Sequence, residues 1–78
     1  MFINAPKRFP VKLTIFATGR EVALFWVDFA SDWIEYAETQ AARMANEHGQ
    51  EIDILTGSVM PSGRVAEWNR EGLRVRPS

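Results

Sequence analysis

The chain of 78 residues has no cysteine and a single histidine, His48. Disulfide bonds and thiolate zinc sites are therefore excluded as supports for the fold. Long apolar runs are also missing, because Lys12 and Thr14 interrupt the stretch 11–17. Neither a membrane span nor a secretory signal is predicted. A soluble, cytoplasmic protein is the expectation.

Motifs that identify enzymes are absent from the sequence as well. It contains no phosphate-binding loop and no dinucleotide fingerprint. Ser58 and Ser62 stand beside glycines, but neither belongs to a G-x-S-x-G nucleophile elbow, so both are interpreted as turn residues. The sequence predicts no enzyme, no catalytic residue and no cofactor.

Two polar features have a chemical and a structural interpretation. His48 is a possible general base or metal ligand, but its place at the end of a predicted helix favours a dipole-stabilised terminal residue. Asp28, Asp32 and Glu35 lie close in sequence and suggest an acid/base pair or a hard-cation site. A capped, acid-rich first helical turn is the favoured interpretation, and no metal site is predicted.

Length and composition predict one domain, 1–78, with residues 1–10 as an irregular lead-in. Residues 11–17 alternate between apolar and polar positions, which is typical of a half-buried strand. Residues 22–29 are nearly all apolar and predict a second strand, buried on both faces. Gly19 supplies the turn between them, so a hairpin is expected at the centre of the sheet.

A helix is predicted from Asp32 to about His48, with Ser31 or Asp32 as its N-cap and Gly49 ending it. Its apolar positions recur at helical spacing and three of them are alanine, which lets the helix lie close to a sheet. These positions are Ile34, Ala37, Ala41, Met44 and Ala45.

The remaining sequence predicts a second hairpin, formed by 52–59 and 64–68 around a turn at 60–63. Residues 69–72 are expected to turn the chain again, and 73–76 to add a short edge strand. The predicted fold is therefore α+β in the order ββαββ(β), with a single helix packed on one face of a small, mainly antiparallel sheet.

Charge is partitioned along the chain. Residues 1–20 carry four cations and no acid, whereas residues 21–53 carry eight carboxylates against Arg43 alone. The expectation is an acidic helix face that biases which partners approach. The predicted contact residues are Asp32, Trp33, Glu35, Tyr36 and Glu38, with the acids pairing and the aromatic residues supplying buried area.

The favoured functional hypothesis is a small non-enzymatic protein-interaction module. Its partner would be a basic protein, such as a nucleic-acid-binding complex, whose arginines and lysines also accept carboxylates. Such a module would act as an inhibitor by occupying the path of the nucleic acid. In size, acidity and lack of catalytic motifs the chain is similar, as a class, to phage-encoded anti-CRISPR inhibitors, and no shared motif carries that likeness.

Two alternatives remain open. Lys12, Phe16, Arg64 and Trp68 combine basic and aromatic side chains, as in binders of single-stranded nucleic acid. The sheet face that the helix leaves uncovered is also a possible dimer surface, which would make the chain an oligomerisation domain.

Overall fold

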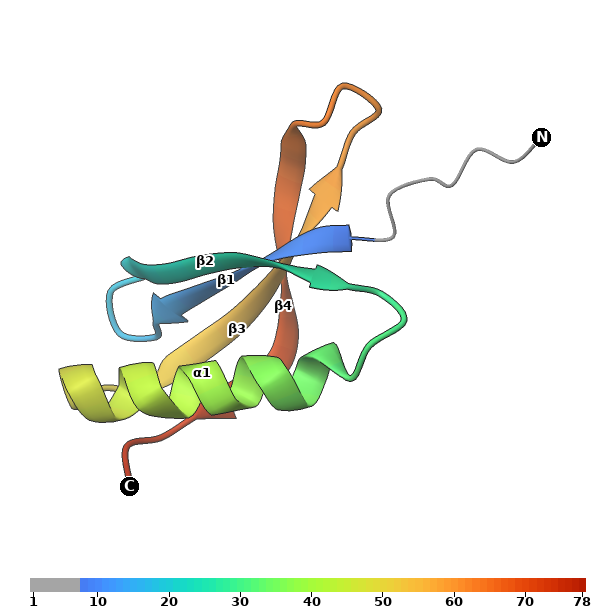
Figure 1. The fold of residues 1–78 in the computed structure, drawn as a ribbon. Helices are drawn as coiled ribbons and strands as arrows, with labels where there is room; N and C mark the ends of the chain where they lie inside the picture. The colour runs from blue at the N-terminus through green and yellow to red at the C-terminus, as the bar shows by residue number, and fades with distance from the viewer. Residues whose placement is uncertain (1–7) are drawn as a thin grey trace.

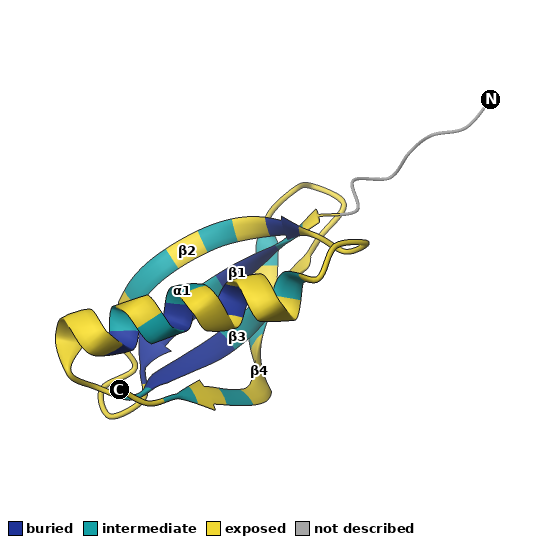
Figure 2. Cartoon of the chain, turned by 60° about the horizontal axis from the view of Figure 1, so that its bottom comes forward, coloured by how far each residue is buried: buried dark blue, intermediate teal, exposed yellow. Residues whose placement is uncertain are grey.

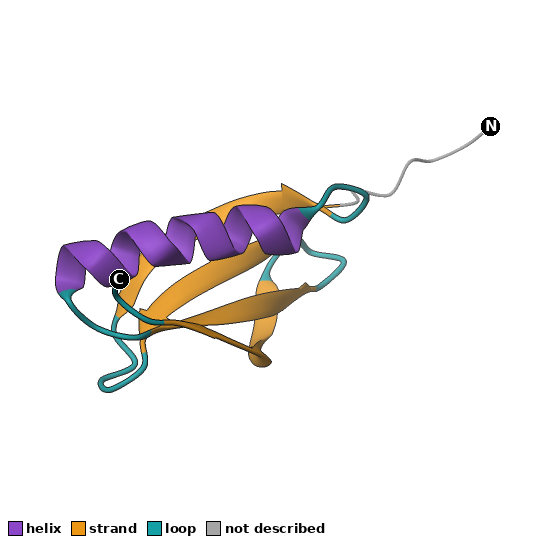
Figure 3. Cartoon of the chain, turned by 90° about the horizontal axis from the view of Figure 1, so that it is seen from below, coloured by secondary structure: helices purple, strands orange, loops and turns teal. Residues whose placement is uncertain are grey.

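The computed structural model describes residues 8–78. Its elements are β1 (Arg8–Ile15), β2 (Glu21–Asp28), α1 (Trp33–His48), β3 (Ile52–Val59) and β4 (Val65–Val75). The four strands form one antiparallel sheet in the order β2-β1-β3-β4, and α1 lies across one face of it (Figures 1 and 3). The predicted α+β fold in the order ββαββ is confirmed.

The core lies between α1 and the two central strands, β1 and β3. Leu13 pairs with Ile54 and Ile15 with Ile52, so these side chains share the face toward the helix. All four are buried, and Figure 2 shows dark blue over most of β1 and over the first part of β3. The alternation in 11–17 therefore predicted the inward face of β1 correctly.

Helix α1 begins and ends as its capping residues predict. The Asp32 carboxylate accepts a hydrogen bond from the Glu35 amide, and Gly49 takes the left-handed conformation at φ +63° and donates its N–H to the Ala45 carbonyl. Ala37, Ala41 and Ala45 are fully buried against the sheet, as expected from the alanine stripe. Ile34 was expected to face inward but is 42% exposed, because it lies at the margin of this narrow stripe.

The predicted position of β2 is wrong. It was expected at the centre of the sheet and buried on both faces, but β2 is an edge strand in which Val27 alone is buried. The register explains its composition. Phe25 pairs with Val11 and faces the helix, whereas Trp26 pairs with Pro10 and faces the other way. Its apolar residues are thus divided between two faces, one of which no other element among residues 8–78 covers.

Two boundaries also differ from the prediction. Strand β1 begins at Arg8, inside the expected lead-in, while residues 1–7 lie outside the described part of the chain. The expected turn at 69–72 is a bulge within one continuous strand, β4, so no separate fifth strand forms at 73–76. Asp53 pairs with Arg74 and Leu55 with Arg70, which leaves extra residues on β4, and Gly72 adopts φ +75° there.

Gly57 of β3 is required by a close approach of three side chains. A Cβ at this position would lie 2.7 Å from Val65 Cγ1 and 2.8 Å from Pro10 Cγ. We expect Gly57→Ala to lower the free energy of unfolding by about 1–3 kcal/mol, because the neighbouring side chains must move apart. Urea denaturation followed by tryptophan fluorescence measures the loss. Ser58→Ala, on the next and exposed residue, is the control; equal losses would contradict the steric argument.

Candidate functional site: the uncovered face of the sheet

The face of the sheet opposite α1 gathers aromatic and basic side chains. Cross-strand partners share a face, so the register identifies its members. We call this surface the open face; it comprises Arg8, Pro10, Lys12 and Thr14 of β1 and Phe16 directly after it, Glu21, Leu24, Trp26 and Asp28 of β2, Asp53 and Leu55 of β3, and Trp68, Arg70 and Arg74 of β4. No other element among residues 8–78 covers it (Figure 3).

Two cation–aromatic contacts lie on the open face, on both sides of its centre. The ammonium of Lys12 is 4.4 Å from the centroid of the Trp68 ring. The guanidinium carbon of Arg74 is 3.5 Å from the centroid of the Phe16 ring. Both distances fall within the range of favourable cation–π attraction. These contacts hold flat aromatic surfaces and positive charges next to each other.

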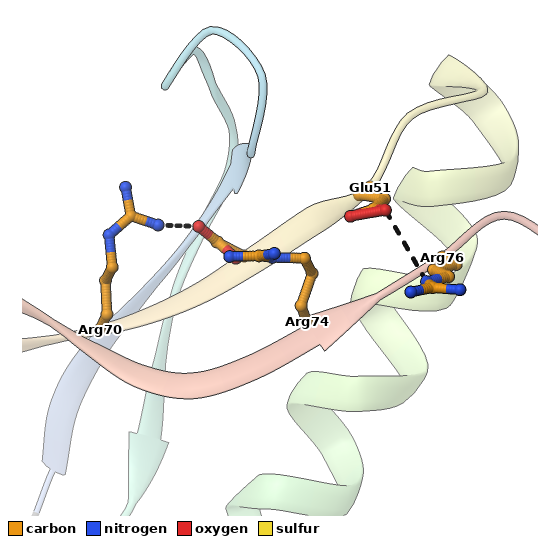
Figure 4. A network of polar contacts seen from close by, with 5 residues as sticks. Glu51, Arg70, Arg74 and Arg76 are labelled. Atoms are coloured by element: carbon orange, nitrogen blue, oxygen red, sulfur yellow. Dashed lines mark hydrogen bonds and ion pairs between the residues drawn. The ribbon is translucent and has the colours of Figure 1, made fainter.

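A buried carboxylate organises the arginines at the centre of this face. Asp53 is 4% exposed and forms ion pairs with Arg70 and, at 2.8 Å, with Arg74 (Figure 4). Its neighbour across the sheet, Thr14, is 5% exposed. Every buried side-chain nitrogen or oxygen among the described residues has a hydrogen-bond partner. Asp53 thus fixes the direction of two guanidinium groups whose other N–H donors remain free to reach a ligand.

A groove extends the open face at the end near the β3–β4 turn. It has a volume of about 700 Å³ and is lined by Arg8 and Trp26 on one side and by Val59, Met60, Pro61 and Gly63 on the other. Trp26 is 42% exposed. An indole face and a guanidinium in one groove suit a flat ring that carries a negative group.

Three of the four residues predicted for nucleic-acid binding come together on this face: Lys12, Phe16 and Trp68. Arg64 lies apart, in the exposed connection between β3 and β4. Arg8, Trp26, Arg70 and Arg74 were not predicted as site residues. Only the strand register identifies them, because it decides which residues of β2 and β4 share a face with Lys12.

The residues predicted for an acidic contact surface are divided by the structure. Trp33 is half-buried, with its ring edge-on to Phe9 at 5.2 Å, and Tyr36 packs edge-on to Phe25 at 5.3 Å. Both aromatic rings have an edge-on partner within the fold, and Tyr36 remains 50% exposed.

The three predicted acids remain on the surface of α1. Asp32 and Glu35 line a shallow depression with Tyr36, and Glu38 lies exposed outside it. Within the described range, none of the three forms an ion pair. The acidic contact surface thus remains a prediction, with Tyr36 as its exposed aromatic residue and Trp33 half-buried.

The other polar candidates, Asp28 and His48, lie at the two ends of the α1 region. Asp28 accepts hydrogen bonds from the Ala30 amide through its side chain and from the Ser31 hydroxyl through its carbonyl, and so shapes the turn before α1. His48 lies in the last turn of α1. Within residues 8–78, no three side chains of the metal-ligating types lie close enough to hold an ion.

No protein-family model, curated protein or solved structure matches the chain. The described part of the chain contains no helix with the length and hydropathy of a membrane span.

Proposed function

We propose that this protein binds single-stranded nucleic acid on its open face, in the cytoplasm. The observation that carries the proposal is the Lys12–Trp68 contact on the same uncovered surface as the Phe16–Arg74 contact. Proteins that bind single strands without strong sequence preference combine aromatic side chains for base stacking with cations for the backbone. The open face offers both.

The dimensions of the open face fit a short single strand. Its β1 positions run from Arg8 to Phe16, which spans about 26 Å at 3.3 Å per residue. The order along this line is Arg8 with Trp26, then Lys12 with Trp68, then Phe16 with Arg74. Aromatic and basic groups thus recur along the strand, which suits a site of about four nucleotides, at the lower end of known site sizes.

The charges of the two faces favour one orientation of the ligand. Helix α1 carries Glu35, Glu38 and Glu47 against Arg43 and repels phosphates from its side. The open face carries four cations, but Asp53 and the edge residues Glu21 and Asp28 partly balance them. Stacking should therefore supply more of the affinity than charge does.

Binding to a fluorescent oligothymidylate, measured by anisotropy, tests this proposal. Trp26→Ala is expected to weaken binding by about 5- to 150-fold, which corresponds to 1–3 kcal/mol for one stacked base. Lys12→Ala should also weaken binding and make its salt dependence shallower. For three phosphate contacts, the wild-type slope of log K against log salt should be about −2.

Arg43→Ala removes a cation from α1 and is the matched control, for which no change is expected. Failure of the wild-type protein to bind at low salt would contradict the proposal. A shift to dimer mass with concentration, abolished by Trp26→Ala, would identify the open face as a self-association surface instead.

A second candidate function is the protein-interaction module with the acidic helix. The observation in its favour is that Asp32, Glu35 and Glu38 are exposed without an ion pair within the described residues. Such a surface would suit an inhibitor of a basic nucleic-acid-binding partner. The likeness in class to anti-CRISPR proteins supports the same role. If a Glu35→Lys, Glu38→Lys variant retains every protein partner of the wild type in pull-downs, this candidate fails.

A further inference from the structure

A second cavity lies on the helix side of the sheet, near the start of α1, because Thr56 pairs with the core residue Val11 and Phe9 with the buried Val27. Its volume is about 310 Å³, and its lining includes Phe9, Phe29, Trp33, Thr56, Glu71 and Arg8. Phe9 stands edge-on to Phe29 at 5.5 Å and to Trp33 at 5.2 Å between ring centroids. The volume falls in the range of small-ligand sites, and the aromatic lining suits a flat ring.

The cavity contains one positioned carboxylate. The hydroxyl of Thr56 donates to Glu71 Oε2 at 2.7 Å, from the neighbouring strand. This hydrogen bond restrains the Glu71 side chain while leaving Oε1 and further lone pairs available. An ionised carboxylate only accepts hydrogen bonds, so it selects a ligand whose edge carries donors.

We infer that this cavity is a guanine-selective subsite for one base of the bound strand. On its Watson–Crick edge guanine presents two adjacent donors, N1–H and the N2 amino group, which match the two oxygens of Glu71. Adenine presents an acceptor beside its amino group and leaves one carboxylate oxygen unmatched. Thymine has a single donor on this edge, flanked by two acceptors.

The position of Arg8 links the subsite to the proposed function, on which this inference rests. Arg8 lines both the open-face groove with Trp26 and the aromatic cavity with Phe29. A strand on the open face reaches the cavity by turning around the end of the sheet at Arg8, the first residue of β1, whose guanidinium can pair with the connecting phosphate. The same guanidinium disfavours a cationic ligand, which the aromatic rings and Glu71 would otherwise attract.

Oligothymidylates with one terminal substitution test the subsite. Binding is measured by anisotropy for strands that end in guanine, adenine, hypoxanthine or thymine, at either the 5′ or the 3′ end. At one end, guanine should bind about tenfold more tightly than adenine or thymine, and hypoxanthine, which lacks the amino group, should lie between them. Glu71→Gln should reduce the guanine preference to less than about threefold and leave the affinity for plain oligothymidylate unchanged.

Controls separate this inference from the function on which it rests. Glu67→Gln removes a carboxylate from the same strand outside the cavity and should keep the preference, whereas Phe29→Ala should lose it. Binding of oligothymidylate with no guanine preference would overturn the subsite and leave the proposed function standing. Titration with guanosine monophosphate, followed by the NMR signal of the Trp33 indole, tests the cavity directly. If the Trp33 indole signal does not shift on titration, the subsite is overturned, whether or not the open face binds the strand.

Discussion

Replacing both Arg70 and Arg74 by methionine is expected to lower the free energy of unfolding by about 3–5 kcal/mol, because Asp53 is left as a buried charge without a cation. The Asp53 side chain is 5% exposed, whereas those of Arg70 and Arg74 are 59% and 43% exposed. The buried Asp53 carboxylate therefore needs its arginine partners, whereas the two guanidinium groups remain in contact with water without it. A loss of this size is a large share of the stability of a small domain. Urea denaturation, monitored by tryptophan fluorescence, measures it.

Two further variants show whether the buried charge is the cause. Adding Asp53→Asn to the double variant should restore most of the lost stability, because the neutral amide needs no cation. Arg76→Met removes an exposed partner of Glu51, at 3.7 Å and 83% exposed, and should change stability by less than about 0.5 kcal/mol (Figure 4). If Asp53→Asn fails to rescue the double variant, the arginines stabilise the fold through packing instead.

The elements of this fold were predictable where a local pattern decides them. The capping residues Asp32 and Gly49 fixed the limits of α1 to within a residue. Alternation in 11–17 gave the inward face of β1. The place of β2 in the sheet was not predictable from hydrophobicity. A nearly continuous apolar run predicts a strand buried on both faces, but β2 has the same composition at the edge of the sheet, with one face open to water. The continuous β4 was missed because Gly72 signals a turn and a bulge equally well.

The candidate site was less predictable because it depends on register. Lys12, Phe16 and Trp68 were identified from their residue types, but Trp68 lies on another strand, and only pairing brings it to Lys12. Nothing in the sequence identifies Arg70 and Arg74 as the partners of Asp53. The four-residue spacing of these arginines is bridged by the bulge, which brings both to one carboxylate.

The structure also changes the interpretation of the charge partition. Glu51 and Asp53 belong to the acidic segment of the sequence, but each is paired with an arginine of the C-terminal segment. Apart from Glu21 at the start of β2, the exposed acids of the acidic segment without an ion pair among the described residues lie on α1 and the turn before it. The cations Arg8, Lys12, Arg70 and Arg74 of β1 and β4 lie on the opposite side of the sheet, where Glu21, Asp28 and Asp53 balance part of their charge.

Leu13→Ala should cost about 3–5 kcal/mol of unfolding free energy, because a cavity forms where the surroundings cannot collapse. Leu13 is fully buried and pairs with Ala23 and Ile54 on the strands at either side, so hydrogen-bonded ladders hold its neighbours apart. Leu24→Ala makes the same chemical change on the open face, where Leu24 is 52% exposed. Its loss should stay below about 1 kcal/mol. A one-residue slip of β2 would turn Leu24 toward the helix, so similar losses in chemical denaturation would contradict the register on which the open face depends.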